Sequence, residues 1–313
     1  MLKILKSFPH KIWGNPWIVL FYTASIWGCN AVAAKLATNQ ISPMCLVFLR
    51  WVIVCSILGF FLRKAISLHS STLISSWKKL LWMGFAGFTG FSALFYLAAY
   101  KTTAVNITLL QSSMPPLVML GAIIFFREKV TIIRVIGMAM ALSGMFVIAT
   151  RGDLKQLLLL NFNLGDVAII LACLLYAAYT LSLRNRPLIP SLVFFFGMSI
   201  SALISSLPLA VGEVAGGYAY WPSLEGFLIL IFVAFGPSLT AQLAYMRGVE
   251  LIGPARASLF PSLVPAFGAL FSIIILGENF ESYHLCALIL GLGGVYIAES
   301  KLGKVNTLKT RVT

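Results

Sequence analysis

The chain has 313 residues, of which 60% are hydrophobic and 10% are charged, and its formal net charge is +14 at pH 7. Soluble domains carry charge on roughly 25% of their residues, so this composition excludes an ordinary soluble protein and indicates an integral membrane protein. The lysines and arginines lie between hydrophobic runs rather than along one basic face, which argues against nucleic acid as a partner.

Ten apolar stretches of spanning length follow one another along the chain, and their connections are too short to form a further domain. We therefore predict an all-α integral membrane protein with ten transmembrane helices. Short basic tails at 1–15 and 300–313 flank them. The predicted spans are 16–37, 43–62, 80–100, 103–126, 131–149, 165–183, 190–212, 224–246, 254–276 and 281–299.

The distribution of lysine and arginine gives the orientation. When the segments between spans are assigned alternately, 18 of these residues fall on the side of the N-terminus and four on the other side, while Arg50 lies inside a span. Positive residues are enriched on the cytoplasmic side of membrane proteins. Both termini are therefore predicted to be cytoplasmic, in a multi-pass protein of the inner (cytoplasmic) membrane.

The fourth span, 103–126, combines a polar first half with a proline pair. Unpaired amides and hydroxyls are costly in hydrocarbon, so these side chains are expected to face protein or water. Pro115 and Pro116 remove backbone donors and are expected to open the helix there. Broken, polar spans are where transporters tend to bind substrate. The polar residues are Asn106, Thr108, Gln111, Ser112 and Ser113.

The same pattern returns 150 residues later, where a gapless comparison of 104–149 with 254–299 gives nine identities in 46 positions. Proline, glutamate and glycine matches in one register indicate an internal duplication. Each half holds five spans, an odd number, so the second half enters the membrane from the opposite side. We expect inverted repeats at 16–149 and 165–299. The three informative matches are Pro115/Pro265, Glu128/Glu278 and Gly144/Gly294.

These features resemble the EamA-type members of the drug/metabolite transporter superfamily, from about Pro16 to Ala298. The resemblance implies ten helices in two inverted five-helix repeats, a central cavity lined mainly by spans 1, 3, 4, 6, 8 and 9, and transport of small metabolites, often amino-acid efflux. Arg134 and His284 depart from the pattern, since a glutamine is common at these two places. The marks of the family are Trp27-Gly28, Arg50-Trp51, Pro115, Glu128, Gly137, Gly144, Pro254, Pro265, Gly277-Glu278 and Gly291–Gly294.

Candidate substrate-binding residues are amides, hydroxyls and aromatic rings within the spans predicted to face the interior. An amide at mid-depth can bind a carboxylate or an ammonium, or it can join two helices. Aromatic rings offer stacking and cation–π contacts, or ordinary packing. The candidates are Trp27, Asn30, Tyr96, Gln111, Ser112, Tyr176, Tyr179, Gln242, Tyr245 and Ser262.

Four further residues are candidates for gating or coupling. Arg50 lies inside the second span, where a cation is costly and suggests a function, although pairing at a helix end is an equal alternative. Glu128 and Glu278 end corresponding helices and serve either a gate or the helix hairpins. His284 lies near Glu278 and changes charge near neutral pH. Since no carboxylate lies in the middle of a span, the sequence favours facilitated export or exchange over a dedicated ion relay.

The sequence favours an alternating-access carrier for a small polar or amphipathic metabolite, an amino acid or a relative. Carriers of S-adenosylmethionine-like or nucleotide-sugar-like metabolites, and a membrane-embedded structural or assembly protein, remain alternatives. An enzyme is not expected, because no HExxH, GxSxG or DxD-type set occurs. The five cysteines show no CxxC spacing and the three histidines are scattered, so neither a metal nor a cofactor is expected. We expect a monomer or weak homodimer.

Overall fold

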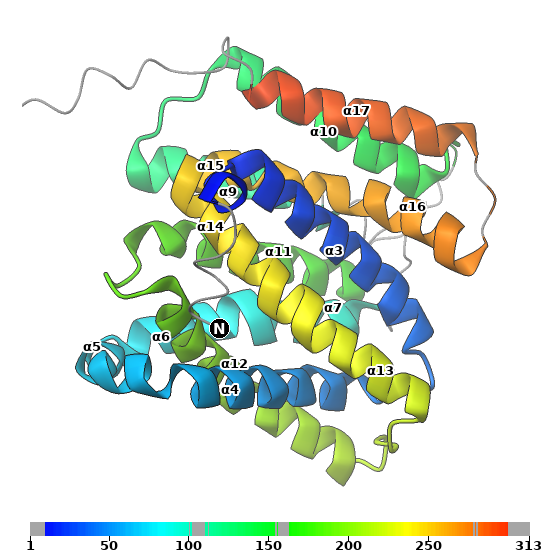
Figure 1. Ribbon diagram of the computed structural model, residues 1–313. Coiled ribbons are helices and arrows are strands. Elements are labelled where there is room, and N and C mark those ends of the chain that lie inside the picture. Colours follow the sequence, from blue (N-terminus) through cyan, green and yellow to red (C-terminus); the bar gives the residue numbers. More distant parts are fainter. Residues whose placement is uncertain are drawn as a thin grey trace, which may run out of the picture.

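The computed structural model describes residues 10–99, 101, 110–111, 113–153, 155, 163–277, 279 and 281–299, and every regular element in these ranges is a helix (Figure 1). In the first half these are α2 (His10–Trp13), α3 (Pro16–Leu36), α4 (Pro43–Leu68), α5 (Ser70–Ser75), α6 (Trp77–Gly84), η1 (Phe85–Gly90), α7 (Phe91–Ala99), α9 (Met114–Phe126) and α10 (Ile132–Thr150). In the second half they are α11 (Leu164–Ser182), η3 (Leu183–Asn185), α12 (Ser191–Ala215), α13 (Leu224–Val233), η4 (Ala234–Ala241), α14 (Gln242–Ile252), α15 (Pro254–Ala257), η5 (Phe260–Leu263), α16 (Val264–Leu276) and α17 (Ser282–Glu299).

Several of these helices are long and apolar enough to cross a bilayer, which fits a multi-pass membrane protein. Within the described residues, six candidate spans have at least 18 residues, and three shorter apolar helices accompany them. The long spans are Pro16–Leu36, Pro43–Leu68, Leu164–Asn185, Ser191–Ala215, Leu224–Ile252 and Pro254–Ile275; the shorter helices are Met114–Phe126, Ile132–Val147 and Ser282–Ala298. Helix α4 continues past its predicted end at 62 to Leu68, because a helix can extend beyond the hydrocarbon into water.

The first long helix of each half begins at an asparagine cap. The Asn15 side chain accepts hydrogen bonds from the backbone N–H groups of Trp17 and Ile18, and Pro16 opens α3. In α11, Asn163 accepts from the Gly165 N–H at 2.8 Å, and Asp166 accepts from the N–H of Asn163 in return. Both caps satisfy donors that a helix start leaves open, so they define where each helix begins.

Helices α9 and α16 correspond closely. Each has 13 residues, the two start 150 positions apart, and each ends at a residue with left-handed backbone, Arg127 or Gly277. Pro115 and Pro265 lie in the first turns, where a missing N–H costs no intrahelical bond. In the second half a turn and the 3₁₀ segment η5 separate α15 from α16, so the chain is interrupted where the prolines predicted it.

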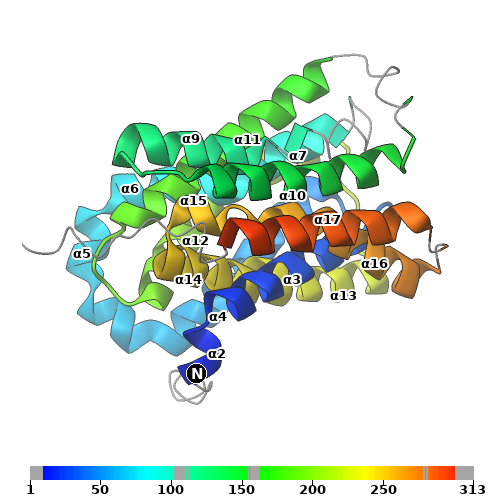
Figure 2. The ribbon, with the colours of Figure 1, turned by 90° about the horizontal axis from the view of Figure 1, so that it is seen from above.

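Four helices form the two edges of the bundle. Helix α10 lies beside α17 at one edge, and α4 lies beside α12 at the other (Figures 1 and 2). The α10–α17 approach depends on glycine, because a Cβ on Gly294 would lie 2.5 Å from the carbonyl oxygen of Gly137. Small residues at such a contact allow two helix backbones to approach closely.

Between the edges, the helices that line the interior pack in matching pairs. Helix α3 packs against α16 and α14, and α11 packs against α9 and α7. The α3–α16 approach is close, since a Cβ on Gly28 would lie 2.6 Å from the Cβ of Phe267. Each half also contains a π-helical segment, η1 in the first and η4 in the second. Such segments often mark functional sites.

Candidate substrate cavity

A cavity of about 240 Å³ lies among helices of both halves. Its described walls come from α3, α4, the η1–α7 segment, Gln111, the start of α9, α10, α11, the η4–α14 segment, η5 and α16. Both π-helical segments contribute, through Gly87 and Phe88 in η1 and Pro237 and Ser238 in η4. The cavity therefore lies where the two proline-started helices and the two π-helical segments meet.

Six of the ten predicted substrate-binding residues line this cavity: Trp27, Asn30, Gln111, Tyr176, Gln242 and Ser262. They come from segments spread between positions 27 and 262, so the fold brings them together from both halves of the chain. Ser112 and the side chain of Tyr96 lie outside the described residues.

The other two predicted tyrosines lie behind the cavity wall. Tyr179 and Tyr245 are both 0% exposed and are not among the lining residues. The Tyr179 hydroxyl accepts a hydrogen bond from Gln242 Nε2 at 2.7 Å, whereas the Tyr245 hydroxyl pairs with Thr180 Oγ1 at 3.3 Å. Tyr179 therefore orients an amide of the cavity wall, while Tyr245 bonds to a hydroxyl outside it.

An aromatic cluster joins this second layer to the cavity. The Tyr176 ring lies 5.4 Å from the Tyr179 ring and 5.9 Å from the Tyr245 ring, between centroids. Trp27 contacts Tyr176 and Tyr245, and its Nε1–H donates to the carbonyl oxygen of Pro237 in η4 at 3.4 Å. Aromatic rings at these distances attract one another, so the cluster stabilises this part of the wall.

Arg50 lies in the cavity wall and is 9% exposed. Its Nη2 donates to the Ser92 hydroxyl at 2.7 Å, and its guanidinium carbon lies 5.4 Å from the centroid of the Trp51 ring. Among the lining residues in the described ranges, Arg50 is the only one with a charged side chain. The sequence singled out this cation as a candidate for gating or coupling; the structure places it beside the predicted binding residues.

Sequence reasoning missed several residues of the wall. Ser92 and Ser238 line the cavity and were not among the candidates. Each is a polar residue inside an apolar stretch, which is the pattern that could have identified them. Phe88, Phe91 and Phe95 gave no comparable signal, because the chain has 23 phenylalanines and only the three-dimensional packing selects among them.

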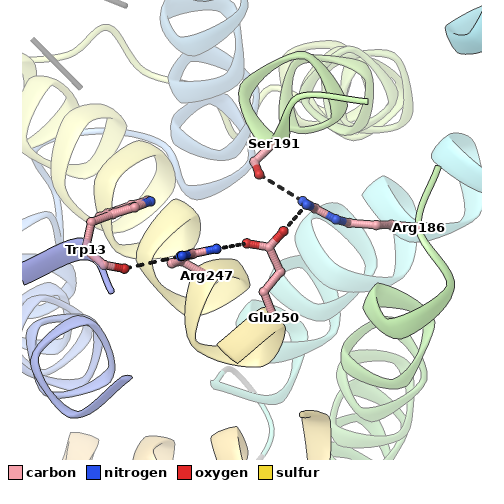
Figure 3. Close-up of polar contacts among 5 residues, drawn as sticks. All are labelled: Trp13, Arg186, Ser191, Arg247 and Glu250. Atoms are coloured by element: carbon pink, nitrogen blue, oxygen red, sulfur yellow. Dashed lines mark hydrogen bonds and ion pairs between the residues drawn. The ribbon is translucent and has the colours of Figure 1, made fainter. Parts of the chain in front are cut away.

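A separate group of ion pairs lies at the end of the bundle near η3 (Figure 3). Glu250 bridges Arg186 and Arg247; its distance to Arg247 Nη1 is 3.0 Å. Arg247 also donates to the carbonyl oxygen of Trp13 at 3.2 Å, and Arg186 donates to the Ser191 hydroxyl at 3.1 Å. Burial, followed by the positive charge of Arg247, lowers the pKa of Arg186. The segment after η3 is thereby held to α14, and α14 is held to α2.

Glu128 belongs to the same end of the molecule. Its Oε1 accepts from Arg184 Nη1 at 2.5 Å, and the Arg184 guanidinium lies 4.4 Å from the centroid of the Phe126 ring. This contact joins the end of α9 in the first half to η3 in the second. We name the contacts of Glu128 with Arg184 and of Glu250 with Arg186 and Arg247 the ion-pair cluster.

Two gating candidates remain, His284 and Glu278. His284 is 8% exposed, and its Nδ1 accepts from the backbone N–H of Glu281, the residue before α17, at 2.9 Å. The ring also contacts Tyr283 in a tilted arrangement, with centroids 4.1 Å apart. Glu278 lies outside the described residues.

These features define a multi-pass helical membrane protein with a polar and aromatic cavity between its halves. The chain belongs to the EamA-like transporter family, whose sequence profile matches residues 15–150 and again residues 163–299. This match confirms the resemblance drawn from the sequence motifs.

Individual relatives and one solved structure are similar over nearly the whole chain. The uncharacterized transporter YyaM of Bacillus subtilis is 23% identical over 94% of this chain and 97% of its own. The uncharacterized inner membrane transporter YicL of Salmonella typhimurium is 28% identical over 88% of this chain and 91% of its own. A structure described as "Crystal structure of protein" superposes with a TM-score of 0.76 at 18% identity, over 90% of this chain and 95% of that one. At that identity the likeness shows the fold alone.

Proposed function

We propose that this protein is an alternating-access secondary transporter that exports a small polar or amphipathic metabolite, an amino acid or a relative, across the cytoplasmic membrane. The observation that carries the proposal is the cavity, whose amides, hydroxyls and rings come from both halves of the chain. A few placed polar groups within a largely apolar wall are typical of small-molecule sites. A structural or assembly protein has no need of such a cavity.

The matching helix pairs support two inverted five-helix repeats, 16–149 and 165–299, within ten spans with both termini cytoplasmic. Helix α3 of the first half packs against α16 and α14 of the second half. In the same way, α11 of the second half packs against α9 and α7 of the first half. The edge pairs α10–α17 and α4–α12 each join equivalent helices. Such symmetry permits two conformations of similar energy that open on opposite sides of the membrane.

The ion-pair cluster supplies a gate on the side predicted to be cytoplasmic. Glu128 of the first half and Arg184 of the second must separate if the halves rock apart at this end. The two side chains are 26% and 44% exposed. Ion pairs this exposed contribute about 0.2–1 kcal/mol each, so they bias the closed state without locking it.

The transport proposal is tested by counterflow in proteoliposomes of the purified full chain, loaded with a panel of amino acids and related metabolites. We expect accelerated exchange of a subset of the panel, and at least a tenfold lower rate for Gln111→Ala, because Gln111 lines the cavity. Tracer release no faster than from empty liposomes, for every compound in the panel, would contradict a transport function. S-adenosylmethionine and a nucleotide sugar belong in the panel, since these were the alternative substrate classes.

A further inference from the structure

A second cavity, of about 230 Å³, lies at the same end of the bundle as the ion-pair cluster. It is separate from the candidate substrate cavity, because no described residue lines both. Its described walls come from α2, α4, the start of α12 and α14. The lining is aliphatic apart from three side chains, Trp13, Ser191 and Arg247.

The positive charge beside this cavity exceeds the negative charge. Figure 3 shows Glu250 between Arg186 and Arg247, so that one carboxylate serves two guanidinium groups. Burial, and after it the charge of Arg247, lowers the pKa of Arg186, which means that the two cations still repel each other. No acidic residue is among the described lining residues. This group of three side chains therefore has a surplus of one positive charge.

Arg247 also has donors left for a ligand. Its Nε–H donates to the carbonyl oxygen of Trp13 at 3.2 Å, and its Nη1 donates to Glu250 at 3.0 Å. A guanidinium carries five N–H groups, so three of them have no partner among the described residues. The Ser191 hydroxyl accepts from Arg186 at 3.1 Å and keeps its own O–H as a donor on the same wall. A guanidinium and a hydroxyl together suit the oxygens of a phosphate.

The surroundings of the cavity suit a lipid better than a soluble phosphate. Phe61 is 55% exposed beside the lining residue Leu62, and Leu188 is fully exposed shortly before α12 begins. Exposed apolar side chains on a membrane protein face acyl chains, and tryptophans such as Trp13 are enriched at the membrane–water boundary. The volume lies below the range of about 300–1,000 Å³ in which drug-sized ligands bind. The cavity therefore has room for a headgroup whose acyl chains stay outside.

We propose that this second cavity binds the phosphate group of an anionic phospholipid, with Arg247 and Ser191 donating to the phosphate oxygens. Basic pockets between transmembrane helices on the cytoplasmic side, where this end is predicted to lie, bind lipid headgroups in membrane proteins. The bound headgroup balances the surplus charge and joins α2, α4, α12 and α14 at one end of the bundle. This site goes beyond the proposed transport function and does not depend on it.

Native mass spectrometry of the purified full chain in detergent tests the proposal, because each bound lipid adds its own mass. The probes are phosphatidylglycerol, phosphatidylcholine and diacylglycerol with identical acyl chains; the first has a net negative charge, the second a choline that offsets its phosphate, and the third no phosphate. We expect one phosphatidylglycerol to bind about fivefold or more tightly than phosphatidylcholine, which corresponds to about 1 kcal/mol for one basic residue, and diacylglycerol to bind weakest. Equal affinities for the first two lipids would overturn the proposal.

Variants locate the charge responsible. Arg247→Gln is expected to remove the preference for phosphatidylglycerol. Arg184→Gln is the matched control, because Arg184 lies at the same end of the bundle and also pairs with one glutamate, but does not line the cavity. A preference that survives in Arg247→Gln, or that is lost equally in Arg184→Gln, would overturn the proposal.

A steric variant keeps the test decisive if Arg247→Gln does not fold. Ala65→Phe places a ring in the cavity from α4 and leaves every charge in place. We expect it to lower the affinity for phosphatidylglycerol by about fivefold or more, the same loss as removal of the charge. An unchanged affinity would show that the lipid binds elsewhere and would overturn the proposal.

Soluble phosphates distinguish the two sources of this chemistry. Inorganic phosphate and glycerol phosphate carry the charge without acyl chains, so we expect neither to displace phosphatidylglycerol at the concentration at which the lipid saturates the site. Displacement at that concentration would overturn the lipid assignment and identify a site for a soluble phosphate instead.

Discussion

The hydrogen bond between Gln242 and Tyr179 links a buried second layer to the cavity wall, and Tyr179→Phe breaks it with little other change. The ring stays, so its contact with Gly87, which has no Cβ to obstruct it, and its edge-on packing with Phe88 are preserved. Only the hydroxyl that accepts from Gln242 Nε2 at 2.7 Å is lost. Gln242 is 5% exposed, so water is a poor replacement partner.

The expected effect follows from the strength of one neutral hydrogen bond. Such a bond contributes about 0.5–1.5 kcal/mol, which corresponds to about a 2- to 13-fold change in an equilibrium constant. We expect Tyr179→Phe to lower kcat/KM for transport by about this factor, because Gln242 is no longer held in the orientation that faces substrate. The assay is initial-rate counterflow in proteoliposomes, normalised to the amount of folded protein.

Tyr245→Phe is the matched control. Tyr245 is as deeply buried and also contacts the Tyr176 ring. The variant loses one hydroxyl contact, to Thr180, but no side chain of the cavity wall loses a partner. We expect a comparable loss of thermal stability and less than a twofold change in transport. Equal transport losses in the two variants, or no loss in Tyr179→Phe, would refute the assignment of Tyr179 as a positioning residue.

Two further predictions concern the gate and the topology. Glu128→Gln removes the ion pair with Arg184 and is expected to raise the fraction of molecules open at that end by about 1.4- to 5-fold. The readout is the alkylation rate of Ser262→Cys in inside-out vesicles, and a rate that does not rise contradicts the gate. Cysteines in place of Lys101 and Lys129, both exposed, are expected to react with impermeant reagents from opposite membrane faces; labelling from one face would refute the predicted span order.

Much of the fold was accessible from the sequence because a bilayer imposes few solutions. The backbone N–H and C=O groups of a span must be hydrogen-bonded within the protein, so an apolar run of spanning length predicts a helix. The start of α9 follows from Pro115, because proline is tolerated in a first helical turn. The repeat of that helix 150 residues later was equally visible, since its proline and the glutamate that follows it recur at Pro265 and Glu278. The π-helical turns of η1 and η4 were not visible, because one extra residue in a turn leaves an apolar run unchanged.

The sequence by itself determined that this protein is a helical membrane protein with a recurring broken helix and polar residues such as Asn30 and Gln111 in its spans. Tertiary structure alone decided which of those residues share a cavity. Tyr176 lines the wall, whereas Tyr179, three positions along the same helix, is fully buried behind it. The physical reason is that helix rotation and neighbour packing set the direction of each side chain, and an apolar run specifies neither. The same holds for Arg50, whose place in the wall depends on how α4 packs against the rest of the bundle.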